Sequence, residues 1–440
     1  MKALSDRHLN FLRWGLIAVM SVYMISLAAG NICIWDDELF TLHLVDHPIS
    51  QMWGPIIDDL VHPPLYYYSL KLFLYLFPKD HLSVIPAAKL FSVLWIILLM
   101  ILGSRMIVKR FGTFSALLFV LLCAGNMTVG YSVEIRMYSM AMCFAGLNAL
   151  FAERVSRTWE TKDLAMLAGM TLFCAYTNYF ALFSAAFLWL WLLYEAGKAG
   201  KLKAWILTAL ICFVLYLPWA VTVLLNRKPV ADYAAEMSLA RALSLFAFPF
   251  SCHNTTVSIM FMLFVLTLVG FILLSGKKDL FFLACLFNPI LIGLTCIVLS
   301  FLFQKFVIGR YLLPGFAILW AGIAAGAAEL KRKEIVLPML AVLDIAMCFF
   351  IFQNEANDRI AARNMVAYFE QETAPVYAEL GVRDMLVYLC GEREFSPSME
   401  DNPSGRYYVY YWTDDWQRVR YKPRPAKFRL SAQSVEVHTD

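Results

Sequence analysis

Long apolar runs recur along most of the chain, and they constrain its fold more than any other feature. A transmembrane helix needs about 20 mostly apolar residues to cross a bilayer. Runs that approach or exceed this length lie at residues 14–34, 83–108, 112–131, 135–152, 164–178, 180–197, 203–225, 257–275, 280–303, 311–328 and 335–352. The chain is 61% hydrophobic and 16% charged, whereas soluble domains are about 45–50% apolar and about 25% charged. The sequence therefore predicts an all-α polytopic membrane protein with about 11 transmembrane helices.

The charges between these runs predict how the spans are oriented. Cytoplasmic loops of membrane proteins carry an excess of Lys and Arg. If the N-terminus is cytoplasmic, every second connection is basic, at residues 104–110, 153–162, 198–203, 276–278 and 331–333. The first run is longer than the roughly 7–15 apolar residues of a signal peptide, so we expect an uncleaved span. These patterns predict a multi-pass protein of the cell (plasma) membrane with a cytoplasmic N-terminus.

One apolar segment is too short to be a further span. The stretch "LYYYSLKLFLYLF" at 65–77 has Tyr and Lys mixed through it, as in a helix that lies in the headgroup region of a membrane. Counting it as a span would also invert every later loop and break the charge pattern. We therefore predict one external loop at 35–82 that contains an interfacial helix, with Tyr66, Tyr67 and Tyr68 as an aromatic belt.

The composition changes after the last apolar run. "NEANDRIAARNMVAYFEQ" has the spacing of an amphipathic helix, and "MLVYL" and "RYYVYYW" have the composition of short strands. The sequence therefore predicts two domains, a transmembrane domain at 1–353 and a small extracytoplasmic α/β domain at 354–440.

Four polar clusters fall on the predicted external side of the membrane. They are "WDDE" at 35–38, "HPP" at 62–64, "EIRMY" at 134–138 and "GRYLLP" at 309–314. Ionisable groups near lipid are costly, and they commonly mark a functional site that faces a cavity. The acids suit a base or a ligand, whereas His62, Arg136 and Arg310 suit the binding of a phosphate. No compact set of metal ligands is visible, so the sequence leaves a divalent metal undecided.

The order of these motifs resembles a known family. "WDDELFTLHL", "HPPLYYYSLKLF", "YSVEIRMYSMAM", "YTNYF" and "GRYLLPGFAILWAG" follow one another as in bacterial members of the protein O-mannosyltransferase and aminoarabinose-transferase superfamily. These are GT-C glycosyltransferases of family 39 and its relatives. The resemblance is strong over 14–195, patchy to about 330, and absent beyond. The family pattern W-x-D-E aligns Asp37 and Glu38 with its acidic pair, and Asn178 stands where many relatives have His.

The resemblance implies transfer of a sugar from a polyprenyl-phosphate carrier to an external glycolipid, wall polymer or protein. An inverting transfer needs a carboxylate that takes the acceptor proton and donors that stabilise the departing phosphate. We therefore predict Asp37 as the general base, with Glu38 orienting the acceptor or neighbouring cations. The residues predicted to bind substrate are His62, Glu134, Arg136, Tyr138, Arg310 and Tyr311.

Simpler interpretations are open for these residues and for the chain. The acids could be a solvated loop start, Glu134 and Arg136 a structural ion pair, and Arg310 an interfacial residue. The chain could also be a transporter or lipid flippase of envelope glycan precursors, or an envelope scaffold. Transporters usually have related halves and broken helices near the midplane, whereas here the polar clusters share one side. Asp344 lies within the last span and receives no role.

Overall fold

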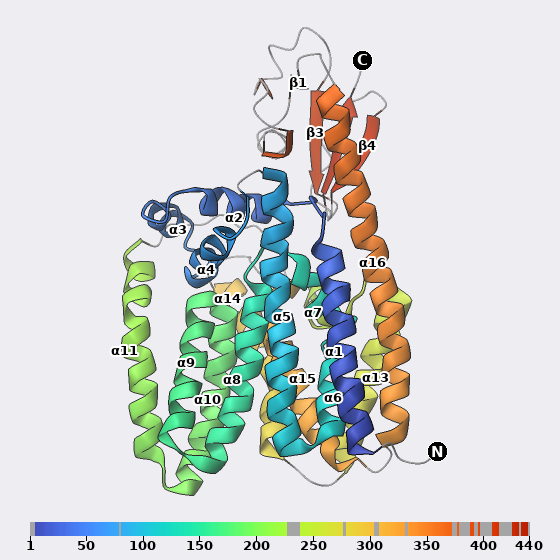
Figure 1. Ribbon diagram of the computed structural model, residues 1–440. Helices are drawn as coiled ribbons and strands as arrows, with labels where there is room; N and C mark the ends of the chain where they lie inside the picture. Colours follow the sequence, from blue (N-terminus) through green and yellow to red (C-terminus); the bar gives the residue numbers. More distant parts are fainter. Residues whose placement is uncertain are drawn as a thin grey trace.

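The computed structural model is a bundle of helices with a small group of strands at one end (Figure 1). It describes residues 5–78, 81–226, 238–275, 279–302, 308–330 and 333–371. In the C-terminal part it describes 376–377, 388–390, 395–396, 407–412, 425–430 and 433–438. The helices of the bundle are α1 (Asp6–Ala28), α5 (His81–Phe111), α6 (Thr113–Leu122), α7 (Met127–Gly130), α8 (Tyr138–Thr158), α9 (Thr161–Thr177), α10 (Tyr179–Ala199), α11 (Leu202–Asn226), α13 (Thr255–Leu274), α14 (Leu280–Leu302), α15 (Leu313–Gly326) and α16 (Lys333–Gln371).

A helix lies over each of the eleven predicted ranges, but fewer have the length and composition of a membrane span. Among the described residues, seven helices are long and apolar enough to cross a membrane, or up to eight if the bent pair α6 and α7 forms one span. Helices α9 and α15 have 17 and 14 residues, and α8 ends in a charged turn. The protein is thus a multi-pass membrane protein, and the count of eleven spans stays a prediction.

Three short helices lie across one end of the bundle (Figure 1). They are α2 (Asp36–Asp46), α3 (Trp53–Asp59) and α4 (Leu65–Leu74), all within the predicted external loop. Helix α4 covers the predicted interfacial segment, but Tyr66 and Tyr67 are buried in the core. The prediction of an aromatic belt was therefore wrong for these two tyrosines, because α4 packs against α2 and α5 rather than presenting that face outward.

Helix α6 is interrupted before α7, with a bend of 63°. Gly125 adopts a φ of +77° there, and a Cβ atom at this position would lie 3.0 Å from Asp344 Oδ1 on α16. Asn126 caps α7 by accepting a hydrogen bond from the Thr128 N–H at 2.9 Å. The break turns the chain into the 3₁₀ helix η1 (Tyr131–Val133) and carries the segment 134–138 to the end of the bundle where α2 lies.

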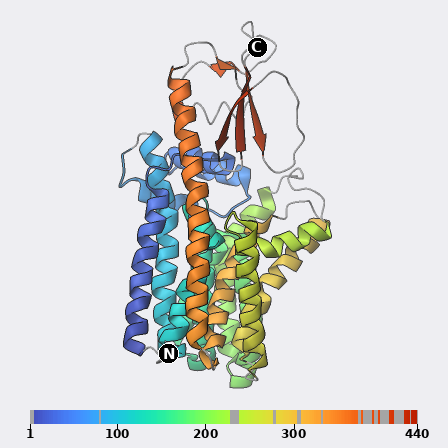
Figure 2. The same ribbon diagram turned by 90° about the vertical axis from the view of Figure 1, so that its right-hand side faces the viewer.

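Helix α16 passes the predicted domain boundary at residues 353 and 354 without a break. Figure 2 shows it extending beyond the bundle to strands β3 (Tyr407–Trp412), β4 (Pro425–Leu430) and β5 (Gln433–His438). These form an antiparallel sheet in the order β3-β5-β4, whereas β1 (Val376–Tyr377) and β2 (Phe395–Ser396) pair in parallel. In the predicted strand "MLVYL", the described residues Tyr388 and Leu389 are helical, and 385–387 lie outside the described residues.

The basic connections that the structure describes gather at the end of the bundle away from α2. Residues 104–110 form the last turns of α5, 153–158 end α8, and 198–203 join α10 to α11. The predicted basic connections at 276–278 and 331–332 lie outside the described residues. Which side of the membrane each end faces stays a prediction.

Candidate active site

The three acids of "WDDE" form the first turn of α2. A helix N-terminus carries a partial positive charge that favours nearby anions, which explains an acidic run that would be costly elsewhere near lipid. Glu38 reaches back and accepts a hydrogen bond from the Trp35 N–H at 3.2 Å. It also accepts one from the Ile135 N–H at 2.7 Å and pairs with Lys89 Nζ at 3.3 Å. Glu38 is buried, so its carboxylate fixes the local structure.

The carboxylate of Asp37 meets two arginines. Its Oδ2 lies 3.1 Å from Nη2 of Arg310 and 3.9 Å from Nη2 of Arg136. About a third of its side chain (35%) remains exposed, in contrast to the buried Glu38. Asp37 is thus held in position by cations and can still be reached by a substrate.

Arg136 ties α2 to the segment after η1. One of its terminal nitrogens donates to the Asp37 carbonyl at 2.9 Å and to Thr41 Oγ1 at 2.9 Å. Only 4% of the side chain is exposed. These bonds hold the first turn of α2 and leave Arg136 little freedom to move toward a ligand.

Arg310 comes from the 3₁₀ helix η3 (Gly309–Leu312), immediately before α15. Its guanidinium lies 4.8 Å from the centre of the Trp35 ring and 6.0 Å from that of Tyr138. The Trp35 indole N–H in turn donates a hydrogen bond to Glu134. A guanidinium over aromatic rings gains cation–π stabilisation while its N–H groups stay available. Trp35 therefore orients Arg310 and also fixes Glu134.

Several buried donors in this cluster have no hydrogen-bond acceptor among the described residues. They are Nε of Arg136, Nε of Arg310 and the Tyr67 hydroxyl. A buried donor without a partner is costly, so an anionic ligand that supplied oxygens here would relieve the cost.

His62 is buried close to both arginines. Burial lowers the pKa of its imidazole well below the ordinary value, and Arg136 and Arg310 lower it further. The ring is therefore neutral near pH 7, so it can donate one N–H to a phosphate but adds no positive charge. Its predicted contribution to phosphate binding is thereby limited to a hydrogen bond.

Glu134 lies in a strongly acidic neighbourhood. Burial raises the pKa of its carboxyl above the ordinary value, and the nearby Glu38 raises it further. Its hydrogen bond with Trp35 gives it a structural partner, and its contact with substrate stays a prediction. Tyr311 stacks its ring on Phe180 of α10, with centroids 4.3 Å apart and planes at 14°. It packs η3 against the bundle.

The sequence interpretation overlooked the roles of Trp35, Thr41, Tyr67 and Lys89 in this cluster. Lys89 lies in the apolar segment "PAAKLFS" of α5, where it pairs with Glu38 and donates to the Val133 carbonyl at 3.2 Å. A lysine within a span could have been recognised from the sequence as part of a polar cluster, because such a charge needs a partner. Tyr67 gave no comparable signal, since adjacent tyrosines are also typical of membrane interfaces.

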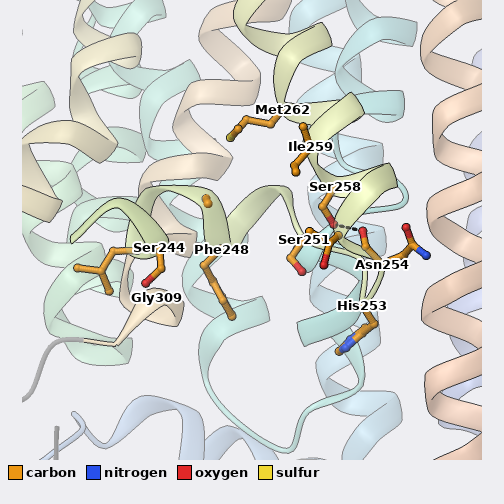
Figure 3. Close-up of a pocket in the computed structure, with 12 residues that line it drawn as sticks. Ser244, Phe248, Ser251, His253, Asn254, Ser258, Ile259, Met262 and Gly309 are labelled. Atoms are coloured by element: carbon orange, nitrogen blue, oxygen red, sulfur yellow. Dashed lines mark hydrogen bonds between the residues drawn. The ribbon is translucent and has the colours of Figure 1, made fainter. Parts of the chain in front are cut away.

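A cavity of about 490 Å³ is lined in part by Gly309, the residue before Arg310 (Figure 3). Its polar lining consists of hydroxyl, amide and imidazole side chains, most of them just before or within the first turns of α13. They belong to Ser244, Ser251, His253, Asn254, Thr255 and Ser258. Phe248 packs on Gly309 and lies 5.5 Å from the Tyr131 ring. No group of three His, Cys, Asp or Glu that could hold a metal ion occurs within the described ranges.

Comparisons with known proteins connect this arrangement to solved structures. No family model matches the chain, and no curated protein matches it in sequence. Two crystal structures of ArnT from Cupriavidus metallidurans match it, one in the apo state and one bound to undecaprenyl phosphate. Each has a TM-score of 0.58 at 12% identity. The matches cover 96% and 97% of this chain, respectively, and 97% of each ArnT chain.

The likeness extends beyond the region where the sequence motifs resemble the family. Motif resemblance fades after about residue 195, yet the structural match continues over nearly the whole chain. At 12% identity such a match shows a shared fold and no more, because many unrelated sequences can adopt the same fold. The chain thus shares the fold of these ArnT structures over nearly its whole length.

Proposed function

We propose that this protein is an integral-membrane glycosyltransferase. It moves a sugar from a polyprenyl-phosphate-linked donor to an extracytoplasmic acceptor, with inversion at the sugar carbon. The acceptor is a glycolipid, a wall polymer or a protein. The ArnT fold supports this class, and the undecaprenyl phosphate bound in one ArnT structure supports a lipid-phosphate donor.

The observation that carries the proposal is the environment of Asp37. A partly exposed carboxylate lies beside the guanidinium of Arg310, and donors without partners surround the pair. A transfer between a lipid phosphate and a nucleophile needs both elements close together. It needs a proton acceptor for the nucleophile and N–H groups for the leaving phosphate.

In the proposed step the acceptor's nucleophilic oxygen attacks the anomeric carbon while its proton passes to the Asp37 carboxylate. The bond from that carbon to the phosphate oxygen breaks, and the electron pair leaves with the polyprenyl phosphate. Arg310 Nε and the Tyr67 hydroxyl would donate to the departing phosphate, and His62 would add a neutral N–H. Arg136 and Glu38 would hold the first turn of α2 in place, as their buried contacts indicate.

The break between α6 and α7 is a feature that transporters also use. Here it is capped by Asn126 and leads directly into the segment that carries Glu134 and Arg136. It thereby supports the ionic cluster at the α2 end, which favours the enzyme over the transporter.

The test is sugar transfer by purified protein in lipid vesicles, with a polyprenyl-phosphate sugar donor and an envelope glycolipid extract as acceptor. Asp37→Asn keeps the size and polarity of the side chain but removes the proton acceptor. We expect its rate to fall by about 10²–10⁴-fold.

Asp36→Asn is the matched control, because it removes the same charge one residue earlier in the same helical turn. It should retain most of the activity. An inactive Asp36 variant beside an active Asp37 variant would move the base by one position. Full activity of both would exclude the acid–base mechanism.

A further inference from the structure

A second cavity, of about 670 Å³, lies at the end of the bundle away from Asp37, between α5, α8 and α9. One part of its wall is basic, and its cations are Arg105, Lys109, Arg110, Arg154 and Arg157. The other part is apolar, with Leu102, Met106, Leu147, Leu150, Met166 and Met170. The cavity therefore combines a cationic and a hydrocarbon-like surface.

The cations of this cavity outnumber the acids that contact them. Glu153 accepts from Arg110 at 2.9 Å and from Arg157 at 2.8 Å. Arg154 pairs with Asp163 at 2.8 Å. Two carboxylates against five cations leave a net charge of +3.

Arg105 and Lys109 form no ion pair with any described side chain. They lie four residues apart on α5, so they project from the same side of the helix. Like charges at this spacing repel each other, and a bound anion would remove that repulsion.

We propose that this cavity binds an acidic glycerophospholipid, with its phosphate between Arg105 and Lys109 and an acyl chain along the apolar wall. Leu102 and Met166 are 37% and 41% exposed at the bundle surface, so the apolar wall is open to the surrounding bilayer. A soluble phosphate would gain nothing from that wall. Basic pockets between helices near a membrane surface are suited to anionic headgroups.

The experiment measures lipid binding by the full chain in detergent, by native mass spectrometry. The probes are phosphatidylglycerol, phosphatidylcholine and inorganic phosphate, each added alone. The test variant is Arg105→Gln with Lys109→Gln. Its matched control is Lys201→Gln with Lys203→Gln, which removes two exposed lysines at the same end of the bundle but outside the cavity.

We expect the wild type and the control to retain phosphatidylglycerol and to release phosphatidylcholine. The test variant should retain the acidic lipid about tenfold less, and phosphatidylglycerol should raise the unfolding temperature of the wild type more than that of the variant. The single variant Lys109→Gln, with a smaller loss, serves if the double variant does not fold.

Equal retention of phosphatidylglycerol by the wild type and a folded test variant would overturn the proposal. Equal retention of both lipids would do the same. Stabilisation by inorganic phosphate as large as that by the lipid would assign the cavity to a soluble anion instead. Because the readout is binding, the result is independent of whether the chain transfers sugar.

Discussion

At the α2 end of the bundle, charged groups contact residues far away in the sequence, whereas at the opposite end some contacts are local. Asp37 and Arg310 are 273 positions apart, and Glu38 and Lys89 are 51 apart. At the basic end, Glu153 and Arg157 lie four positions apart on one helix. The first arrangement requires the folded bundle, whereas the i,i+4 pair can form within an isolated helix.

The two ends also differ in solvent exposure. Glu38 and Lys89 expose 2% and 5% of their side chains, whereas Arg110 and Arg157 expose 49% and 42% and only their partner Glu153 is buried, at 9%. A buried pair has a fixed geometry and is costly to break, while an exposed pair rearranges at little cost. At the α2 end a buried pair thus fixes the helix turn that carries Asp37, whereas the arginines at the opposite end keep much of their freedom to move.

The largest expected effect is all-or-none and concerns the sidedness of the two ends. A reporter fused after Gly200 should lie in the cytoplasm, and one fused after Gln371 should lie outside, because basic connections favour the cytoplasm. Each position is fused separately to alkaline phosphatase, which is active outside the cytoplasm, and to green fluorescent protein, which fluoresces inside it. A position that is silent with one reporter should therefore be active with the other, which controls for expression. If both positions lie on the same side, the two ends do not face opposite compartments.

The second prediction compares a fully buried pair with one whose arginine is largely exposed. Lys89→Met leaves Glu38 buried without its cation and should lower the free energy of unfolding by about 3–5 kcal/mol. Arg157→Met removes a largely exposed arginine and leaves Glu153 paired with Arg110, so it should cost about 0–1 kcal/mol. Thermal unfolding of the purified variants measures the difference.

Adding Glu38→Gln to Lys89→Met removes the isolated charge, so the double variant should be more stable than Lys89→Met alone. Equal losses for Lys89→Met and Arg157→Met would refute the distinction between the two ends.

The third prediction concerns Arg310 and the donor. Arg310→Ala should lower kcat/KM for the polyprenyl-phosphate sugar by roughly 10–100-fold, since a hydrogen bond to a charged group contributes about 1.5–3 kcal/mol. Arg310→Lys should recover part of the loss, because an ammonium lacks the planar fork of a guanidinium. Undiminished turnover of the alanine variant at limiting donor would place the phosphate elsewhere.

The smallest expected effect is a pH dependence caused by Glu134. Its folded-state pKa is raised by burial and by Glu38, so the folded state binds more protons than the unfolded state between the ordinary and the raised value. Stability should therefore fall as pH rises through this window. His62 has a lowered pKa and contributes the opposite slope, so wild type and variant are compared at each pH.

Glu134→Gln keeps an acceptor for the Trp35 indole and removes the titration. Its unfolding temperature should decline less than that of the wild type between about pH 5 and pH 8. Parallel curves for the two proteins would show that Glu134 does not titrate in this range.

The sequence by itself determined the membrane class and the positions of the long helices. Both follow from local properties, because an apolar run near lipid must satisfy its backbone within one helix. The resemblance of "WDDE" to the family pattern W-x-D-E predicts roles for Asp37 and Glu38, and those roles stay a prediction. The burial of Tyr66 and Tyr67 could not be predicted from the sequence, because a tyrosine is equally suited to a core and to a membrane interface.

Only the tertiary structure decided which partner each acid contacts. Asp37 and Glu38 are adjacent and chemically alike, yet one meets Arg310 and the other is enclosed with Lys89. Successive residues of a helix point about 100° apart, so what each side chain meets depends on the elements packed around α2. The continuous helix α16 across the predicted domain boundary has the same kind of cause. The apolar and the polar part of α16 form one continuous helix from Lys333 to Gln371, and the sequence has no helix-ending residue at the predicted boundary.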